Sequence, residues 1–158
     1  MTAGLEDDVL LSATRVVVGI SVRAADQLGE ASLVQLRALT VLSELAAANL
    51  VQLADGMGVT VSTTSRLVDR LVAAGLADRR PSEVTRREIT ITLTPAGRGV
   101  LQRYDDLRVR ALRARLGQLG PGRRTAVVDA LADLTATTPG VPEPATAGDD
   151  RTSVPAAG

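Results

Sequence analysis

Residues 50–75 read LVQLADGMGVTVSTTSRLVDRLVAAG, and this stretch decides the fold. Asn49 followed by Gln52 is a capping-box pattern that starts a short helix, and Gly58 ends it. Thr60 caps the next helix, which continues to the end of the stretch. Its apolar positions are Val61, Leu67, Val68, Leu71 and Val72. Two helices joined by only a few residues predict a helix-turn-helix.

Two further helices are predicted on the N-terminal side of this motif. Residues 5–28 repeat apolar side chains in steps of three and four, which indicates one face of a long helix. Those side chains are Leu5, Val9, Ala13, Val16, Val17, Ile20, Ala24 and Leu28. Gly29 is a stop, and Ser32 with Gln35 is a second capping-box pattern. The helix that follows, to about Leu45, is expected to be largely buried.

On the C-terminal side the period changes from helical to extended. Residues 76–80 read as a short strand, Pro81-Ser82 as a turn, and residues 85–93 alternate as a half-buried strand should. The pair predicts a hairpin with a charged tip. Thr94-Pro95 then caps a helix to about Leu116, and Gly120-Pro121 restarts a last one with Val127, Val128, Leu131 and Leu134 apolar. Residues 137–158 lack large apolar side chains and are predicted to be a disordered tail.

The residues that are missing exclude several classes of function. The 158-residue chain has no Cys and no His, which excludes disulfides, thiol redox sensing and a Ser-His-Asp triad, and we expect no metal site and no cofactor. Phe and Trp are absent and Tyr104 is the only aromatic residue, so binding of single strands by base stacking is not expected. No nucleophile with a base and no Gly-rich phosphate loop is present, so an enzyme is not expected. With no membrane span and an acidic start, we expect a cytoplasmic protein.

Charge is distributed unevenly along a chain whose formal net charge is zero. All 18 basic residues are Arg. Residues 1–30 carry −3, residues 62–88 carry +2 and residues 98–124 carry +6. The Arg residues of the last segment suit phosphate contact, solvation of the helix, or pairing with the acidic first helix of a partner chain.

Several short motifs together resemble the MarR family of winged helix-turn-helix regulators. They are LADGMGVT at residues 53–60, SRLVDRL at 65–71 with Gly75-Leu76, Arg86-Arg87 before the alternating strand, and LTPAGR at 93–98. The strong part of the match covers about residues 50–101, and helix order extends it to about 30–136. The resemblance implies a mainly α fold: a winged helix-turn-helix with a two-stranded β-hairpin wing and N- and C-terminal dimerisation helices.

The helix that begins after Thr60 is the candidate reader of DNA. A helix fits the major groove of B-DNA and presents the side chains of its first turns to base edges. Small hydroxyls permit close approach, the helix N-terminus favours phosphate, and Arg66 is best placed to bind guanine. The candidate residues are Thr60, Ser62, Thr63, Ser65, Arg66 and Arg70, with Thr64 a weaker candidate. Asp69 is spaced to pair with Arg66 along the helix, and the alternative for Arg70 is a solvated helix charge.

The hairpin offers Arg79, Arg80, Arg86 and Arg87. Arg at a β-tip can enter the minor groove, whose potential attracts guanidinium groups. The resemblance assigns Arg86 to the position of the family's wing arginine, with Arg87 beside it. The family usually has Asp before that Arg, where this chain has Thr85. The alternative is a charged hairpin that is kept polar to avoid edge pairing.

We therefore expect four parts: a dimerisation helix (1–30), a winged helix-turn-helix DNA-binding domain (31–94), C-terminal dimerisation helices (95–136) and the tail (137–158). The apolar stripes of the two terminal regions exceed what the chain itself can cover, which predicts a homodimer on a palindromic, inverted-repeat operator in double-stranded DNA. The resemblance implies a transcriptional repressor that is released by a small-molecule effector. Its candidate effector-binding residues are Arg15, Arg37 and Tyr104, each of which can also be an ordinary surface or core residue.

A second function fits the same sequence. A winged helix that has lost DNA binding can use its apolar terminal helices to hold another protein. The zero net charge and the altered wing favour this alternative. A mobility-shift experiment separates the two, since only the regulator retards DNA.

Overall fold

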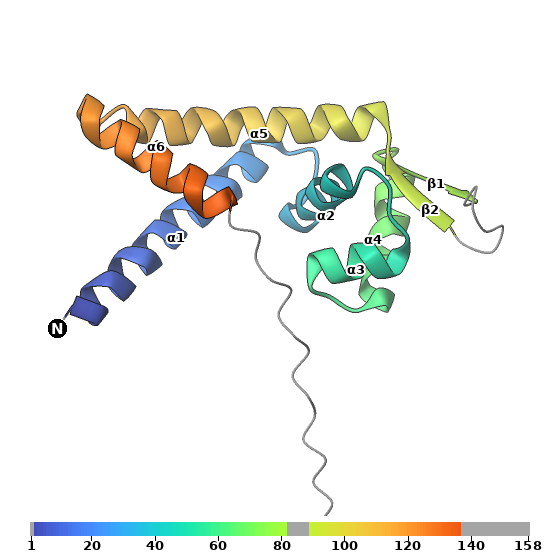
Figure 1. Cartoon of the computed structure of the whole chain (residues 1–158). Coiled ribbons are helices and arrows are strands. Elements are labelled where there is room, and N and C mark those ends of the chain that lie inside the picture. The colour runs from blue at the N-terminus through green and yellow to red at the C-terminus, as the bar shows by residue number, and fades with distance from the viewer. Residues whose placement is uncertain (1, 82–88, 137–158) are drawn as a thin grey trace, which may run out of the picture. The chain divides into compact units, whose positions relative to one another are not determined.

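A computed structural model of the chain describes residues 2–81 and 89–136. The chain divides into two compact units, Met1–Gln118 and Leu119–Gly158. The first unit holds α1 (Thr2–Leu28), α2 (Leu33–Leu45), α3 (Leu50–Met57), α4 (Val61–Ala73), β1 (Ala77–Pro81), β2 (Ile89–Leu93) and α5 (Pro95–Leu116), and the second holds α6 (Pro121–Ala136). The expected mainly helical fold with one two-stranded antiparallel sheet is confirmed (Figure 1).

The helices begin where the capping residues predict. Ser32 and Asn49 each form a complete capping box, with Gln35 and Gln52 respectively. Thr60 and Thr94 accept the backbone N–H three residues on, from Thr63 and Gly97. These caps satisfy donors that would otherwise lack a partner at each helix start.

Three predicted stops are also confirmed. Gly29, Gly58 and Gly75 all have φ near +67°, within a few degrees, where L-residues with a side chain are strained. At Gly58 the backbone N–H groups of Gly58 and Val59 return to the carbonyls of Asp55 and Ala54, which closes α3 with a Schellman motif. The turn between α3 and α4 therefore has a fixed geometry.

One hydrophobic core binds the elements of the first unit together. Its fully buried side chains come from α2, α3, α4 and β2: Leu36, Leu39, Leu42, Leu53, Leu67, Leu71, Ile91, Val68 and Thr64. Buried residues of α1 and α5 pack against them. α2 lies at the centre, in contact with α1, α3, α5 and β2. Among the described residues this core is aliphatic, with Tyr104 as its one aromatic member.

Two glycines permit close approach of neighbouring parts of the chain. Gly56 lies inside α3, where glycine costs ~1 kcal/mol relative to alanine; an added Cβ would come within 2.6 Å of Val41 Cγ1 on α2. Gly97 lies in the first turn of α5, and its Cβ would come within 2.0 Å of the carbonyl oxygen of Leu76. Both positions need glycine because a neighbouring element occupies the space.

The hairpin follows α4 directly. β1 and β2 pair in register from Ala77 opposite Leu93 to Pro81 opposite Ile89. The prediction that Pro81 belongs to the turn was wrong: it is the last residue of β1, a strand end on a sheet edge where proline is tolerated. Ile91 also pairs with Ala48, which ties the loop before α3 to the sheet. The predicted strand residues 85–88 and the hairpin tip lie outside the described residues.

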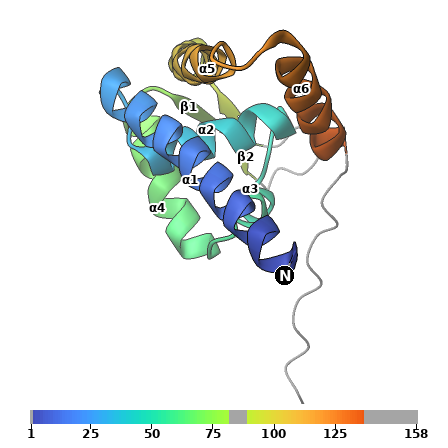
Figure 2. The ribbon, with the colours of Figure 1, turned by 90° about the vertical axis from the view of Figure 1, so that its left-hand side faces the viewer.

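The apolar stripe of α1 is only partly covered within its unit. The C-terminal part of α1 packs against α2 and α5, and Ile20 and Ala24 are buried there. The N-terminal half extends away from the rest of this unit (Figure 1), so that it lies toward the viewer in Figure 2, and 68% of Leu5 is exposed. In α6, considered by itself, no residue is buried, and its apolar side chains Val127, Val128, Leu131 and Leu134 are all exposed.

Candidate nucleic-acid interface

The exposed face of α4 results from strict amphipathic spacing. Thr64, Leu67, Val68 and Leu71 recur at helical steps and are buried in the core, which fixes the rotation of the helix about its axis. The opposite face is polar and exposed. It carries Ser62, Thr63, Arg66, Asp69 and Arg70. The core therefore determines which side chains of α4 face the solvent.

The structure distributes the predicted hydroxyl residues among three roles. Thr60 is the N-cap, and its hydroxyl also donates to Thr63 Oγ1 at 3.0 Å. Ser62 is exposed, with its Oγ 3.2 Å from Thr60 Oγ1, and Ser65 is half-buried. Thr64 is fully buried, and its hydroxyl donates to the Thr60 carbonyl at 3.0 Å. Thr64 is therefore a core residue and not a surface contact.

The basic residues of α4 lie together on its exposed side. Thr63, Arg66, Asp69 and Arg70 line an open hollow in the surface. In the part of the chain that the structure describes, neither Arg66 nor Arg70 has an ion pair. Both guanidinium groups are therefore available to a ligand.

The sequence spacing suggested an ion pair between Asp69 and Arg66, and this was wrong. Asp69 instead pairs with Arg79 of β1, whose Nη1 lies 2.7 Å from Asp69 Oδ1. Arg79 Nη2 also donates to the Ser65 carbonyl at 3.4 Å. Because β1 packs directly on α4, Arg79, 10 positions away in sequence, pairs with the Asp69 carboxylate in place of Arg66 on the same helix.

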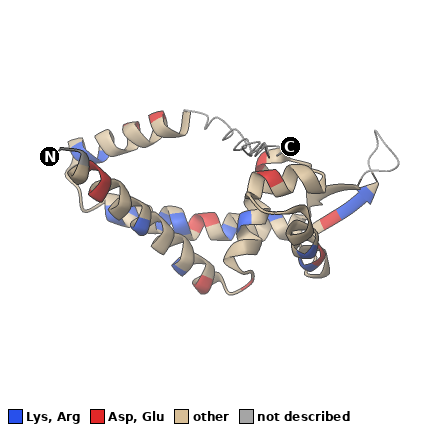
Figure 3. Cartoon of the chain, turned by 90° about the horizontal axis from the view of Figure 1, so that it is seen from below, with Lys and Arg blue, Asp and Glu red and all other residues tan. Residues whose placement is uncertain are grey.

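The remaining basic residues of the hairpin differ in their surroundings. Arg80 is exposed and pairs within its own strand, with Nε 2.9 Å from Asp78 Oδ2. The predicted wing residues Arg86 and Arg87 lie outside the described residues. Arginines are also numerous along α5, as Figure 3 shows.

A second feature of the first unit is a cavity of about 480 Å³ between α1, α2, α5 and the turn before α4. Its walls are mostly aliphatic, including Val17, Val18, Leu33, Val34 and Val59, and its polar lining includes Ser21, Thr40, Arg37 and Arg108. Two of the three predicted effector residues, Arg37 and Tyr104, line this cavity. Arg15 is exposed on α1 and is not among the lining residues.

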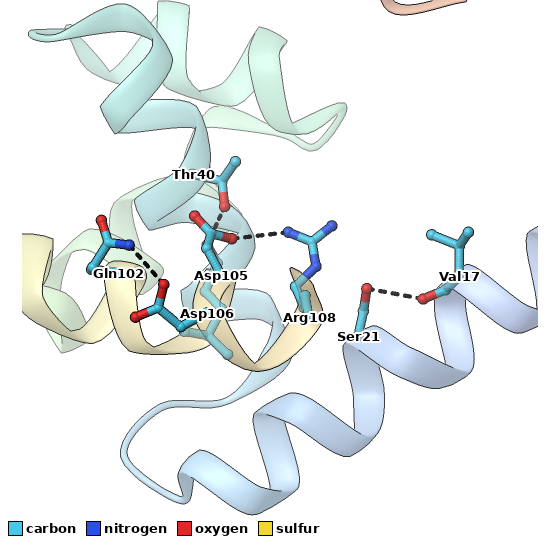
Figure 4. Close-up of polar contacts among 8 residues, drawn as sticks. Val17, Ser21, Thr40, Gln102, Asp105, Asp106 and Arg108 are labelled. Carbon is cyan, nitrogen blue, oxygen red and sulfur yellow. Dashed lines mark hydrogen bonds and ion pairs between the residues drawn. The ribbon is translucent and has the colours of Figure 1, made fainter. Parts of the chain in front are cut away.

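Arg108 is a cavity residue that the sequence reasoning missed. Its guanidinium lies 5.1 Å from the centre of the Tyr104 ring, a cation–π distance, and Nη1 pairs with Asp105 Oδ1 at 3.1 Å. Figure 4 shows Arg108 between Asp105 and the α1 residues Val17 and Ser21. The four-residue step from Tyr104 to Arg108 was the available signal, because such a step places both on one face of α5. The other cavity arginine, Arg37, donates from Nη2 to the Gly56 carbonyl at 3.1 Å.

Other kinds of site are not found in the described part of the chain. No group of three or more acidic residues there is arranged to hold a metal ion. Among the same residues, no helix has the length and apolar character needed to cross a membrane.

Comparison with known proteins gives consistent results. The MarR family profile matches residues 31–89. RV1404 from Mycobacterium tuberculosis, a solved structure, is 36% identical with a TM-score of 0.77, and the match covers 87% of this chain and 94% of that one. A single-residue mutant of MepR from S. aureus, solved bound to an oligodeoxyribonucleotide, is 16% identical with a TM-score of 0.64, covering 83% of this chain and 96% of that one. At that identity the likeness shows the fold alone.

A curated relative in Bacillus subtilis (strain 168), YfiV, is described as an uncharacterized HTH-type transcriptional regulator. It is 28% identical over 103 residues, which is 65% of this chain. The chain spans 64% of the length of that relative. Together with the profile match and the 36% identity to RV1404, the helix-turn-helix and its hairpin show that the chain belongs to the MarR family of winged helix-turn-helix transcriptional regulators.

Proposed function

We propose that the chain binds double-stranded DNA sequence-specifically as a homodimer and represses transcription from an inverted-repeat operator. The observation that carries this proposal is the exposed face of α4, where small hydroxyls precede two arginines that have no ion pair within the described residues. Its buried face fixes the orientation of that surface. A helix of this kind fits the major groove, where Arg recognises guanine by two hydrogen bonds.

The N-terminal end of α4 favours contact with the DNA backbone as well. Ser62 and Thr63 lie in the first turn, beside backbone N–H groups that carry the positive end of the helix dipole. Phosphate oxygens bind readily at such a terminus. We assign Ser62, Thr63, Ser65, Arg66 and Arg70 to the major groove, where the hydroxyls contact bases or phosphates, and Thr60 to the DNA contact at the start of the same helix. Arg86 and Arg87 are assigned to the minor groove on the family pattern.

The dimer is proposed from exposed apolar surface. α1 exposes Leu5, Val9, Leu10, Leu11, Val17 and Val18, and α6 exposes four further large aliphatic side chains. Apolar surface on this scale marks an interface. A two-fold dimer presents two copies of α4 to consecutive major grooves, about one helical turn apart.

The cavity beside α2 is the proposed site of a small-molecule effector. Its aliphatic walls and the guanidinium groups of Arg37 and Arg108 suit a small anion with an apolar body. Tyr104 contributes the one aromatic surface. A ligand there contacts both α1 and the residues just before α4. If the ligand binds one arrangement of these elements more tightly than another, it shifts the protein toward that arrangement and so changes its affinity for DNA.

The experiment that tests the function is selection of bound sequences from random duplex DNA, followed by mobility shift with the recovered site. We expect a palindrome with half-sites about 10 base pairs apart, bound by two chains. If the chain retains no DNA at low salt, the result would instead favour a winged helix that acts as a protein-interaction module.

A further inference from the structure

Asp69 stands in an unfavourable place for a DNA-binding surface. It lies on the exposed face of α4, between Arg66 and Arg70, and it lines the same hollow as both. A carboxylate there repels phosphate and competes for the nearby guanidinium groups. Arg66 precedes it by three residues, a spacing at which helical ion pairs form. A contact that engages the carboxylate from elsewhere would keep Asp69 away from Arg66.

Arg79 provides that contact from outside the helix. Its Nη1 lies 2.7 Å from Asp69 Oδ1, and its Nη2 donates to the Ser65 carbonyl, one turn earlier in α4. The Arg79 side chain is only 29% exposed, whereas that of Asp69 is 59% exposed. The Nε atom of Arg79 is buried and has no hydrogen-bond partner among the described residues. The guanidinium is thus held against α4 at the expense of one donor.

We infer that Arg79 is a positioning residue that holds the Asp69 carboxylate against β1 and so leaves Arg66 and Arg70 free to bind DNA. This inference rests on the proposed DNA-binding function. It assigns to Arg79 a role that differs from direct contact with DNA, because the group acts through Asp69. It also explains why no ion pair to Arg66 is found in the described part of the chain, although the spacing permits one.

Removal of the Arg79 charge releases Asp69. The carboxylate then pairs with Arg66, so this guanidinium in the groove no longer offsets the charge of the flanking phosphates. Each phosphate contact contributes about 0.9 to the magnitude of the log–log salt slope of binding. Arg79→Gln is therefore expected to lower the magnitude of that slope by about 0.9, and Asp69→Asn in the same chain is expected to restore it.

The experiment measures operator affinity between 50 and 200 mM salt, roughly the range over which phosphate contacts dominate. The variants are the parent, Arg79→Gln, Asp69→Asn/Arg79→Gln and Arg79→Lys, each checked for cooperative unfolding by circular dichroism. We expect parent-like slopes for the double variant and for Arg79→Lys, which keeps the ion pair. The inference is overturned if the salt slope of the double variant is as small in magnitude as that of Arg79→Gln, or if Arg79→Gln has the slope of the parent.

Arg80→Ala is the matched control, because it removes the same charge from β1 while Arg80 pairs only within its own strand. In an Arg80→Ala chain, Asp69→Asn is not expected to restore the salt slope of operator binding. Equal restoration in both backgrounds would show a general charge effect and would overturn the assignment to Arg79.

A second readout does not need DNA. The Nε–Hε resonance of Arg66, identified by its loss in Arg66→Ala, is recorded in each variant by NMR. We expect it to shift in Arg79→Gln and to return in the double variant, since only the former frees the carboxylate. An unchanged resonance overturns the inference. If instead the parent binds no duplex at all, the proposed function fails, and the NMR comparison still decides the role of Arg79.

Discussion

Gly97→Ala is the substitution for which the structure gives the clearest expectation. An added Cβ would lie 2.0 Å from the Leu76 carbonyl oxygen, 3.0 Å from its carbonyl carbon and 3.3 Å from its Cα. All three are backbone atoms, so no side-chain rotation relieves the clash. The same oxygen accepts the Thr94 N–H at 3.1 Å, and the Thr94 hydroxyl donates to the Gly75 carbonyl at 2.6 Å. The start of α5 must therefore move away from the segment between α4 and β1, and these hydrogen bonds lengthen.

The expected change in the free energy of unfolding of Gly97→Ala is the balance of opposing contributions. Overpacking at a rigid contact costs about 1–3 kcal/mol, and each weakened hydrogen bond about 0.5–1.5 kcal/mol. Alanine gains back up to about 1 kcal/mol of helix propensity over glycine. We expect a net loss of about 2–4 kcal/mol in the free energy of unfolding, measured by urea denaturation.

Gly99→Ala is the matched control on the same helix. Its Cβ would meet only Arg103 Nη1 at 3.4 Å, the far end of a flexible side chain. This variant is expected to be unchanged or more stable by up to about 1 kcal/mol. If both variants unfold at the same urea concentration, the packing of α5 on the Leu76 carbonyl is not as described.

Three other substitutions test separate parts of the account. Arg66→Ala is expected to cost about 1–3 kcal/mol on the operator and to relax specificity at one base position; an equal loss on random duplex assigns Arg66 to phosphate. Arg86→Ala is expected to lower the magnitude of the salt slope by about 0.9, measured by titration of operator binding; an unchanged slope means that the wing does not touch DNA. Ala46 has φ +60° and lies at the centre of a γ-turn, which a 2.6 Å hydrogen bond from Ala47 N to Leu45 O closes. Because glycine adopts this backbone conformation without strain, Ala46→Gly should raise the free energy of unfolding by roughly 1 kcal/mol. A less stable Ala46→Gly variant would contradict the strained geometry.

Local signals in the sequence were sufficient for most of the fold. The capping residues Ser32, Asn49, Thr60 and Thr94 act within three residues of themselves, so their effect is readable without tertiary information. Glycine stops are equally local, because a positive φ is a property of one residue. The boundaries of the helices in the helix-turn-helix were predictable for this reason.

The contacts that sequence reasoning missed are those between elements. The partner of Asp69 depends on how β1 packs on α4, and helical spacing offered the nearer Arg66 instead. Arg108 enters the cavity because α1 and α5 pack side by side. The four-residue step from Tyr104 places Arg108 on the same face of α5, but it does not reveal that a cavity lies against that face. Gly56 is a further example: its cost to helix propensity can be read from the sequence, but the contact with Val41 that requires glycine there cannot.

The central claim is that the N-terminal turn of α4 lies in the major groove of two half-sites. The chain has no Cys, so a DNA-cleaving iron chelate can be attached at a single Ser62→Cys and, for comparison, at Ala73→Cys at the other end of α4. We predict two symmetric clusters of strand cleavage about 10 base pairs apart from Ser62→Cys, and much weaker cleavage from Ala73→Cys. Equal cleavage from both positions, or none from Ser62→Cys on a bound operator, would contradict the account.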